Sequence, residues 1–182
     1  MFSKILVALD HGDTCEALFK QAITLTQKMN AKLMLLSVLT PEGDEGLTMP
    51  SSSGLAYYSL SANEAIWEMY QKHFEEYETK GLEMLRSFHE EAQAAGVQAE
   101  FTQIFGSPGR SICSLARTWE ADLVMVGSHG RKGMRELILG SVSNYVMHHA
   151  PCSVLVVDAQ TLEAADIDNP TTETADLVAI ES

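Results

Sequence analysis

Long apolar runs are missing from this chain of 182 residues. None reaches the roughly 18 residues that a membrane-spanning helix requires, so the sequence predicts no membrane span. The opening Met1-Phe2-Ser3-Lys4 also lacks the charged region, apolar core and small-residue cleavage site of a secretory signal. We therefore expect a cytoplasmic protein that does not act at a membrane.

Cysteine is scarce: the chain has three, Cys15, Cys113 and Cys152, scattered and odd in number. No CxxC pair and no Cys/His spacing typical of a metal site occurs. This excludes a disulfide framework and a structural zinc site as organising features. We expect free thiols that act as small apolar core residues in a reducing compartment.

Basic residues are also few, since 12 Lys and Arg stand against 25 Asp and Glu, for a net charge of −13. That balance argues against nonspecific binding to nucleic acid. Residues 158–182 carry seven of the acids and no Lys or Arg. We therefore divide the chain into one domain, residues 1–158, and an acidic tail, residues 159–182, that we expect to be disordered.

Several enzyme signatures are absent. The chain contains neither GxxxxGK[ST] nor GxGxxG, so it is neither a P-loop enzyme nor a standard Rossmann dehydrogenase. It has no GxSxG nucleophile elbow, and no general base stands beside a nucleophile. We expect no efficient catalysis.

Five short apolar runs are present, and segments with helical spacing separate them. The runs are 5–9, 33–39, 97–104, 123–126 and 154–157, and the helical segments are 14–30, 63–95, 111–119 and 141–149. This alternation predicts an α/β fold in three layers, a doubly wound parallel sheet with helices on both faces. Gly96 lies where a C-cap is expected for the long helix.

Two of the predicted strands suggest sheet edges. In 97–104 apolar and polar residues alternate, which is typical of a half-exposed edge strand. The run 154–157 is the last strand, yet it is apolar throughout, so something should cover it. We favour a homodimer through this strand, and coverage by the chain's own tail is the alternative.

A long segment, 41–62, is rich in glycine, proline and serine and predicts a loop insertion. It leaves the carboxyl end of the second strand, where ligands of open α/β sheets bind. It could be a lid over a site or a mobile insertion, and the sequence leaves both open.

The most informative motif is Gly127-Ser128-His129-Gly130, followed by Gly140-Ser141 at the start of a predicted helix. Glycines at a strand end let the backbone approach a ligand closely. The first turn of a helix offers unpaired N–H groups and partial positive charge. Together these features predict an anion site, typically for phosphate, and hence a nucleotide-binding protein.

Other residues extend this predicted site. Asp10 ends the first strand, and its carboxylate could accept hydrogen bonds from ribose hydroxyls or hold a metal through water. Asp10 could instead cap the next helix, although Asp13 is better placed for that role. Val38, at the end of the second strand, could line an adenine ring or simply pack in the core. Ser141 and Ser143 could donate hydroxyls to phosphate, although Gly-Ser before a helix is also ordinary capping.

The connection between the glycines holds the densest basic cluster of the chain, Arg131, Lys132 and Arg135. These side chains could neutralise a polyphosphate, or they could be solvated loop charges. His129 lies inside the glycine turn and could touch a ligand.

The residues named so far resemble those of the universal stress protein family. The resemblance covers about residues 1–158 and rests on KILVALD at 4–10, ADLVMVGSHG at 121–130, PCSVLVV at 151–157 and the spacing G-x2-G-x9-G-S from Gly127 to Ser141. It implies the strand order 3-2-1-4-5 of adenine nucleotide alpha hydrolase-like folds, with ATP at the crossover and dimerisation through the fifth strand. The glycine spacing is that of the ATP-binding subgroup.

The resemblance also implies a set of ligand-binding positions. Magnesium or manganese would bridge the phosphates, with Asp10 in contact directly or through water or the phosphates. The nucleotide-binding residues so assigned are Ala8, Leu9, Asp10, Val38, Val126, Gly127, His129, Gly130, Arg131, Gly140, Ser141, Val142 and Ser143.

We therefore expect a dimeric ATP-binding regulatory protein of the stress response, whose nucleotide state is read by an unknown protein partner. Three alternatives remain at this point. They are a slow ATPase or phosphoryl-transfer protein, a sensor of another adenine nucleotide such as AMP, and a structural protein with an empty site.

Overall fold

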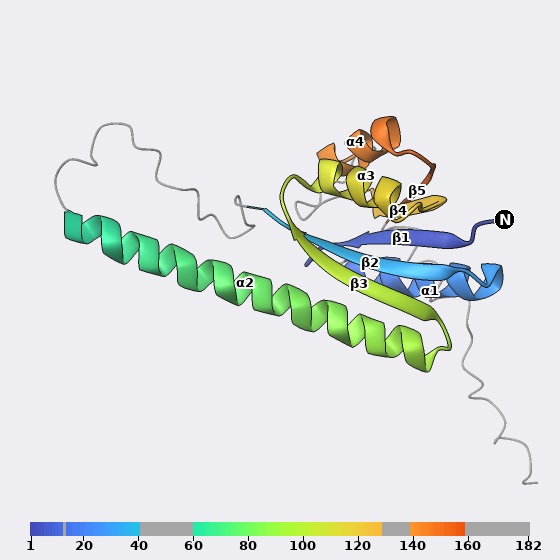
Figure 1. The fold of residues 1–182 in the computed structure, drawn as a ribbon, viewed down its shortest axis with the longest axis horizontal. Helices are drawn as coiled ribbons and strands as arrows, with labels where there is room; N and C mark the ends of the chain where they lie inside the picture. Colours follow the sequence, from blue (N-terminus) through green and yellow to red (C-terminus); the bar gives the residue numbers. More distant parts are fainter. Residues whose placement is uncertain (13, 41–59, 129–138, 159–182) are drawn as a thin grey trace, which may run out of the picture.

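The computed structural model describes residues 1–12, 14–40, 60–128 and 139–158 (Figure 1). Strands and helices alternate along these residues. In chain order they are β1 (Lys4–Leu9), α1 (Cys15–Met29), β2 (Lys32–Leu39), α2 (Leu60–Ala94), β3 (Gln98–Phe105), α3 (Pro108–Thr118), β4 (Leu123–Gly127), α4 (Ser141–His149) and β5 (Ser153–Val157).

The five strands form one parallel sheet in the order β3-β2-β1-β4-β5. Helices α1 and α2 cover one face, and α3 and α4 cover the other (Figure 1). Each face buries its own apolar cluster, one centred on Phe19, Leu35 and Leu85 and the other on Leu36 and Val146. The predicted three-layer doubly wound fold and its strand order 3-2-1-4-5 are confirmed.

The element boundaries differ from the predicted ones at two helix starts. Helix α2 begins at Leu60, so residues 60–62 are helical and do not belong to a loop. Helix α3 begins three residues early because Pro108 occupies its first turn, where the missing N–H costs nothing. The remaining loop residues, 41–59, and the acidic tail, 159–182, lie outside the described residues.

The end of α2 follows the prediction at Gly96. This residue has φ +77°, and its N–H donates to Gln93 O at 2.9 Å while the Val97 N–H donates to Ala92 O at 2.9 Å. These two bonds satisfy the last carbonyls of the helix in the way expected of a glycine C-cap. The chain then turns directly into β3.

Both predicted edge strands are at the edges. Strand β3 is half-exposed along most of its length, as its alternation predicted. Strand β5 is less covered than its apolar sequence suggested. Val154 and Val156 pack against α3 and α4, but Leu155, on the opposite face, is 39% exposed because no helix of the described chain shields it fully.

The cysteines are unpaired, as predicted. Cys15 and Cys113 are buried and Cys152 is half-buried. Desolvation raises the pKa of the Cys15 thiol to about 12, so it stays protonated and acts as a core residue.

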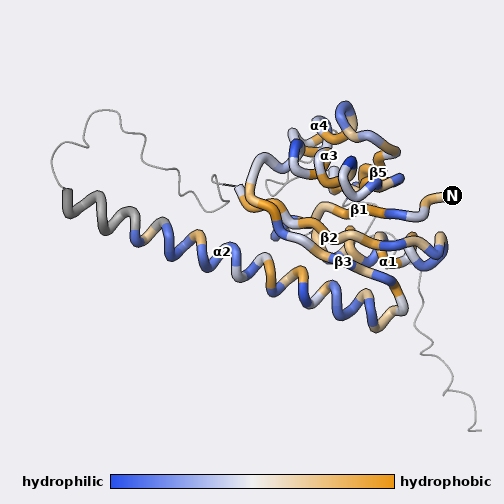
Figure 2. Tube along the Cα trace, in the orientation of Figure 1, coloured by the Kyte–Doolittle hydropathy of each residue, from blue (hydrophilic) through white to orange (hydrophobic). Residues whose placement is uncertain are grey.

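Figure 2 shows apolar residues concentrated on the strands, with α2 alternating between polar and apolar positions. Among the described parts of the chain, no helix combines the length and the apolar character needed to cross a membrane.

Candidate functional site

The two central strands part at their carboxyl ends. Strands β1 and β4 pair only as far as Val7 and Met125. On its outer side β1 continues to pair with β2 through Leu9, and β4 continues to pair with β5 through Gly127. The sheet order reverses at this point, which is where open α/β sheets bind ligands. We call the residues that follow the last β1–β4 pair, 8–10 and 126–128, the switch point.

A backbone hydrogen bond brings the two halves of the glycine motif together at the switch point. The Gly140 N–H donates to Ser128 O at 2.8 Å, and the Ser128 N–H donates to Val157 O at 2.8 Å. The start of α4 is thereby fixed beside the end of β4. His129, Gly130 and Arg131, together with Lys132 and Arg135, lie outside the described residues.

Helix α4 begins with free donors in its first turn. Gly140 is its N-cap, and no side chain caps it. The N–H groups of the first turn have no intrahelical acceptor, which gives this end of the helix the donors and partial positive charge that favour an anion. Ser141 is exposed and Val142 is half-buried at this turn.

Ser143 is buried beside the start of α4. Its side chain is 2% exposed, and its hydroxyl donates to Gly140 O at 2.9 Å and lies 3.3 Å from Ser128 O. In this structure the hydroxyl therefore ties the start of α4 to the end of β4. The three-residue spacing to buried Val146 is the sequence signal for this inward position.

Asp10 follows β1 and is half-buried. Its Oδ1 accepts the Gly12 N–H at 3.0 Å, an aspartate turn that shapes the entry into α1. A Cβ at position 12 would come within 3.0 Å of the same oxygen, so glycine fits there best. Thr14 is the N-cap of α1 and makes no side-chain cap bond. Asp13, the cap expected from the sequence, lies outside the described residues.

The apolar candidates divide into two groups. Leu9 and Val126 are each 3% exposed and belong to the buried clusters. Ala8, Val38 and Val142 are half-buried and pack against the cluster beneath α3 and α4, so they lie on one face. Ile104, which pairs with Val38, shares this half-buried position and was missed by sequence reasoning. Its place at the end of an alternating strand was the available signal.

A protein-built metal site is not evident in what the structure describes. Among those residues, no group of three or more His, Cys, Asp and Glu side chains gathers where it could hold a metal ion. Asp10 is the carboxylate at the switch point, so a metal there would need most of its ligands from elsewhere.

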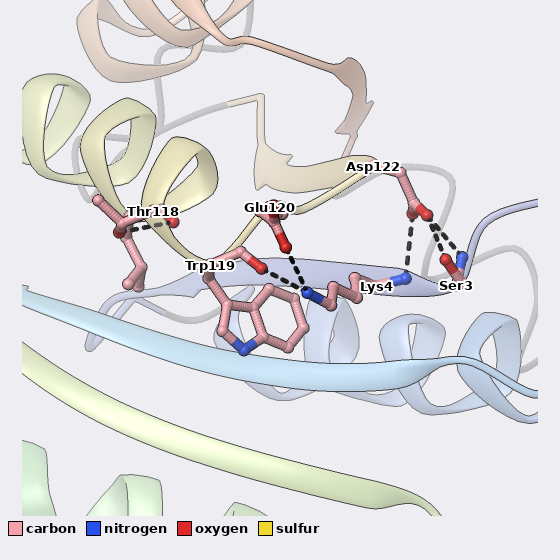
Figure 3. A network of polar contacts seen from close by, with 7 residues as sticks. Ser3, Lys4, Thr118, Trp119, Glu120 and Asp122 are labelled. Atoms are coloured by element: carbon pink, nitrogen blue, oxygen red, sulfur yellow. Dashed lines mark hydrogen bonds and ion pairs between the residues drawn. The ribbon is translucent and has the colours of Figure 1, made fainter.

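The amino end of the same strand pair is closed by polar contacts (Figure 3). Asp122 Oδ2 accepts the Ser3 N–H at 2.8 Å and the Ser3 hydroxyl at 2.7 Å, and its Oδ1 accepts the Lys4 N–H at 3.1 Å. Lys4 Nζ donates to Trp119 O at 3.0 Å and pairs with Glu120 at 3.3 Å. Burial alone would raise the pKa of Asp122, but the bonds from Ser3 and Lys4 outweigh it and lower that pKa.

Residues 1–158 match the universal stress protein family. The universal stress protein Sll1388 of Synechocystis sp. is 39% identical over 156 residues, which cover 86% of this chain and 97% of that protein. The universal stress protein YxiE of Bacillus subtilis is 34% identical over 158 residues, covering 86% of this chain and 99% of that protein.

Solved structures share the fold at lower identity. The universal stress protein UspA of Lactobacillus plantarum superposes with a TM-score of 0.66 at 22% identity, over 86% of this chain and 97% of its own. A universal stress protein in complex with cAMP superposes with a TM-score of 0.55 at 23% identity, over 86% and 97%. An Arabidopsis thaliana family member with AMP bound gives 0.55 at 20% identity, over 86% and 91%.

Proposed function

The chain belongs to the universal stress protein family, and we propose that it binds an adenine nucleotide, ATP in the first instance, at the switch point. The single observation that carries this proposal is the bond from Gly140 N–H to Ser128 O at 2.8 Å. It sets the start of α4 beside the place where β1 and β4 part, so donors for phosphate and an opening in the sheet coincide. The relatives with bound cAMP and AMP support an adenine nucleotide as the ligand class.

In this proposal, different residues of the described structure bind the phosphate, the ribose and the base. Backbone N–H groups at Ser141 and Val142 would bind phosphate, and Gly127 would let the backbone approach it. The Asp10 carboxylate would accept hydrogen bonds from the ribose hydroxyls. Ala8 and Val38, half-buried on the α3–α4 face, would line the base. Ser143 acts indirectly, since its hydroxyl holds the start of α4.

A divalent metal, magnesium or manganese, fits the proposal only as a partner of the nucleotide. Asp10 would be the protein carboxylate near it, while phosphate oxygens and water would complete its coordination. The metal would supply charge neutralisation for the phosphates, and binding of AMP should depend on it less than binding of ATP.

The proposed role is regulatory: nucleotide occupancy changes a surface that a protein partner in the cytoplasm reads. A homodimer through β5 would cover the exposed Leu155 and give the apolar edge strand a pairing partner. Leu155→Lys should shift the chain toward monomer, which sedimentation velocity would detect. An unchanged mass would place the interface elsewhere.

The nucleotide carried by freshly purified protein tests the main proposal. The protein is denatured, and the supernatant is analysed by chromatography and mass spectrometry, followed by titration of stripped protein with ATP, ADP, AMP and cAMP. Bound or titratable ATP supports the proposal. Preference for AMP or cAMP would favour the alternative, a sensor of another adenine nucleotide, and binding of none of the four would contradict the proposal. Turnover well above background would favour the slow ATPase or phosphoryl-transfer alternative.

A further inference from the structure

Helix α2 is held at the same end of the sheet as the switch point. It runs along β3 and extends past the carboxyl ends of the strands (Figure 1). At this end of the sheet, aromatic side chains of α2 contact residues that end a strand or follow one. The Phe74 ring meets Phe105 edge-on at 5.6 Å, and the Tyr77 ring meets His11 edge-on at 5.0 Å. Helix α2 therefore touches the segment that carries Asp10.

His11 links α2 to the segment that carries Asp10. It directly follows Asp10 and lies inside the turn closed by the bond from Gly12 N–H to Asp10 Oδ1, at 3.0 Å. Its ring packs against Tyr77 with an interplanar angle of 62°. The backbone of His11 is thus shaped by the Asp10 turn, while its side chain is anchored on α2.

Gly81 lies where α2 passes close to this turn. A glycine inside a helix is unfavourable, so its presence needs a packing reason. A Cβ at position 81 would overlap Gln103 Nε2 and would lie 3.6 Å from His11 Nε2. Gln103 Nε2 is itself buried and has no hydrogen-bond partner among the described residues. At this point α2 passes close to both side chains, and a side chain at position 81 would require Gln103 to move.

From these contacts we infer that His11 is a positioning residue of the nucleotide site, which holds the Asp10 turn in place by anchoring it to Tyr77 of α2. The inference rests on the proposed nucleotide site and adds a function for α2. Because binding couplings are reciprocal, any effect of the α2 contact on nucleotide affinity is matched by an equal effect of the nucleotide on that contact.

A second histidine on α2 gives a matched control. His89 meets Phe101 of β3 edge-on at 5.2 Å with an interplanar angle of 61°, nearly the geometry of the His11–Tyr77 pair. His89 also hydrogen-bonds to Ala99 O, with 2.9 Å between Nε2 and O, so its removal should cost at least as much stability. Among the described residues its partners lie on β3 and on α2 itself and not in the Asp10 turn, so its removal should leave nucleotide affinity unchanged.

The experiment is a calorimetric titration of the full chain with AMP and with magnesium-ATP. His11→Ala should weaken the affinity about three- to tenfold, because an edge-to-face ring contact no longer holds the turn. His11→Phe retains a ring against Tyr77 and should stay within about twofold of the wild type. His89→Ala should equal the wild type in affinity while lowering the melting temperature.

Tyr77→Leu keeps the test decisive if His11→Ala folds poorly, since it removes the other ring of the same edge-on pair. It should weaken affinity as His11→Ala does, and the double variant should lose no more than either single one. Equal affinities of His11→Ala and His89→Ala, or additive losses in the double variant, would overturn the inference alone. A wild-type chain that binds neither nucleotide would overturn the proposed function together with it.

Discussion

The two ends of the β1–β4 pair differ in how they are held. At the amino end, Asp122 accepts three hydrogen bonds from Ser3 and Lys4, and the strands are joined across the sheet. At the carboxyl end, pairing stops at Val7 and Met125, and the strands part toward Asp10 and Gly127. At the amino end side chains join the two strands, whereas at the carboxyl end backbone N–H groups remain for a ligand. Under the proposed function, stability and ligand binding are assigned to opposite ends of the same two strands.

Gly127→Val should have the largest effect. A branched side chain at the end of β4 would occupy the space that a phosphate or ribose needs, and nucleotide affinity should fall about a hundredfold or more. The far-ultraviolet circular dichroism spectrum should stay that of the wild type, because position 127 ends a strand and does not belong to the buried clusters. Wild-type affinity in this variant would mean that the ligand lies elsewhere.

Asp10→Ala should weaken nucleotide binding about tenfold, because it removes a charged acceptor and opens the Gly12 turn. Asp10→Asn retains an oxygen for the Gly12 N–H and should fall between Ala and the wild type. Titrations with and without magnesium separate the two effects. If both variants bind as the wild type does, Asp10 shapes the turn only.

Asp122→Ala tests the amino end and should leave nucleotide affinity unchanged. It removes the acceptor of three hydrogen bonds and should lower the free energy of unfolding by about 1–2 kcal/mol, a modest value because the carboxylate is only half-buried. Urea denaturation measures this loss. A change in affinity without a change in stability would reverse the roles assigned to the two ends.

The pH dependence of Asp122 gives the smallest effect. Its pKa is lowered in the folded state, so its stabilisation is complete above the unfolded pKa and is lost as the pH falls through the folded one. The stability difference between the wild type and Asp122→Asn should therefore be largest near about pH 7 and shrink toward about pH 3. A difference that grows on acidification would show that the carboxylate is not held in its charged form.

Much of the fold was predictable because its signals are local. Apolar runs predicted the strands, and the alternation in 97–104 predicted a strand at the sheet edge. Gly96 predicted the end of α2, where the structure has a positive φ. The start of α2 was misplaced because Leu60, Ser61 and Ala62 continue a serine-rich segment and were assigned to the loop. The exposure of Leu155 was missed because it depends on where helices end across the sheet, which periodicity does not encode.

The candidate site was predictable only in part. The glycine spacing and the residues after β1 and β2 indicated its place, and Ala8, Val38, Gly127 and Gly140 do lie at the carboxyl end of the sheet. The Ser128–Gly140 bond and the His11–Tyr77 contact join residues far apart in the chain, so no local pattern reports them. The nucleotide-binding roles themselves stay predictions.

Amide hydrogen exchange of the wild-type chain, with and without magnesium-ATP, tests the contrast between the two ends most directly. We expect nucleotide to slow exchange in residues 8–12 and 140–143 and to leave residues 3–6 and 122–124 unchanged. Protection at the amino end, or none at the carboxyl end under conditions where ATP is bound, would contradict the assignment of the switch point as the nucleotide site.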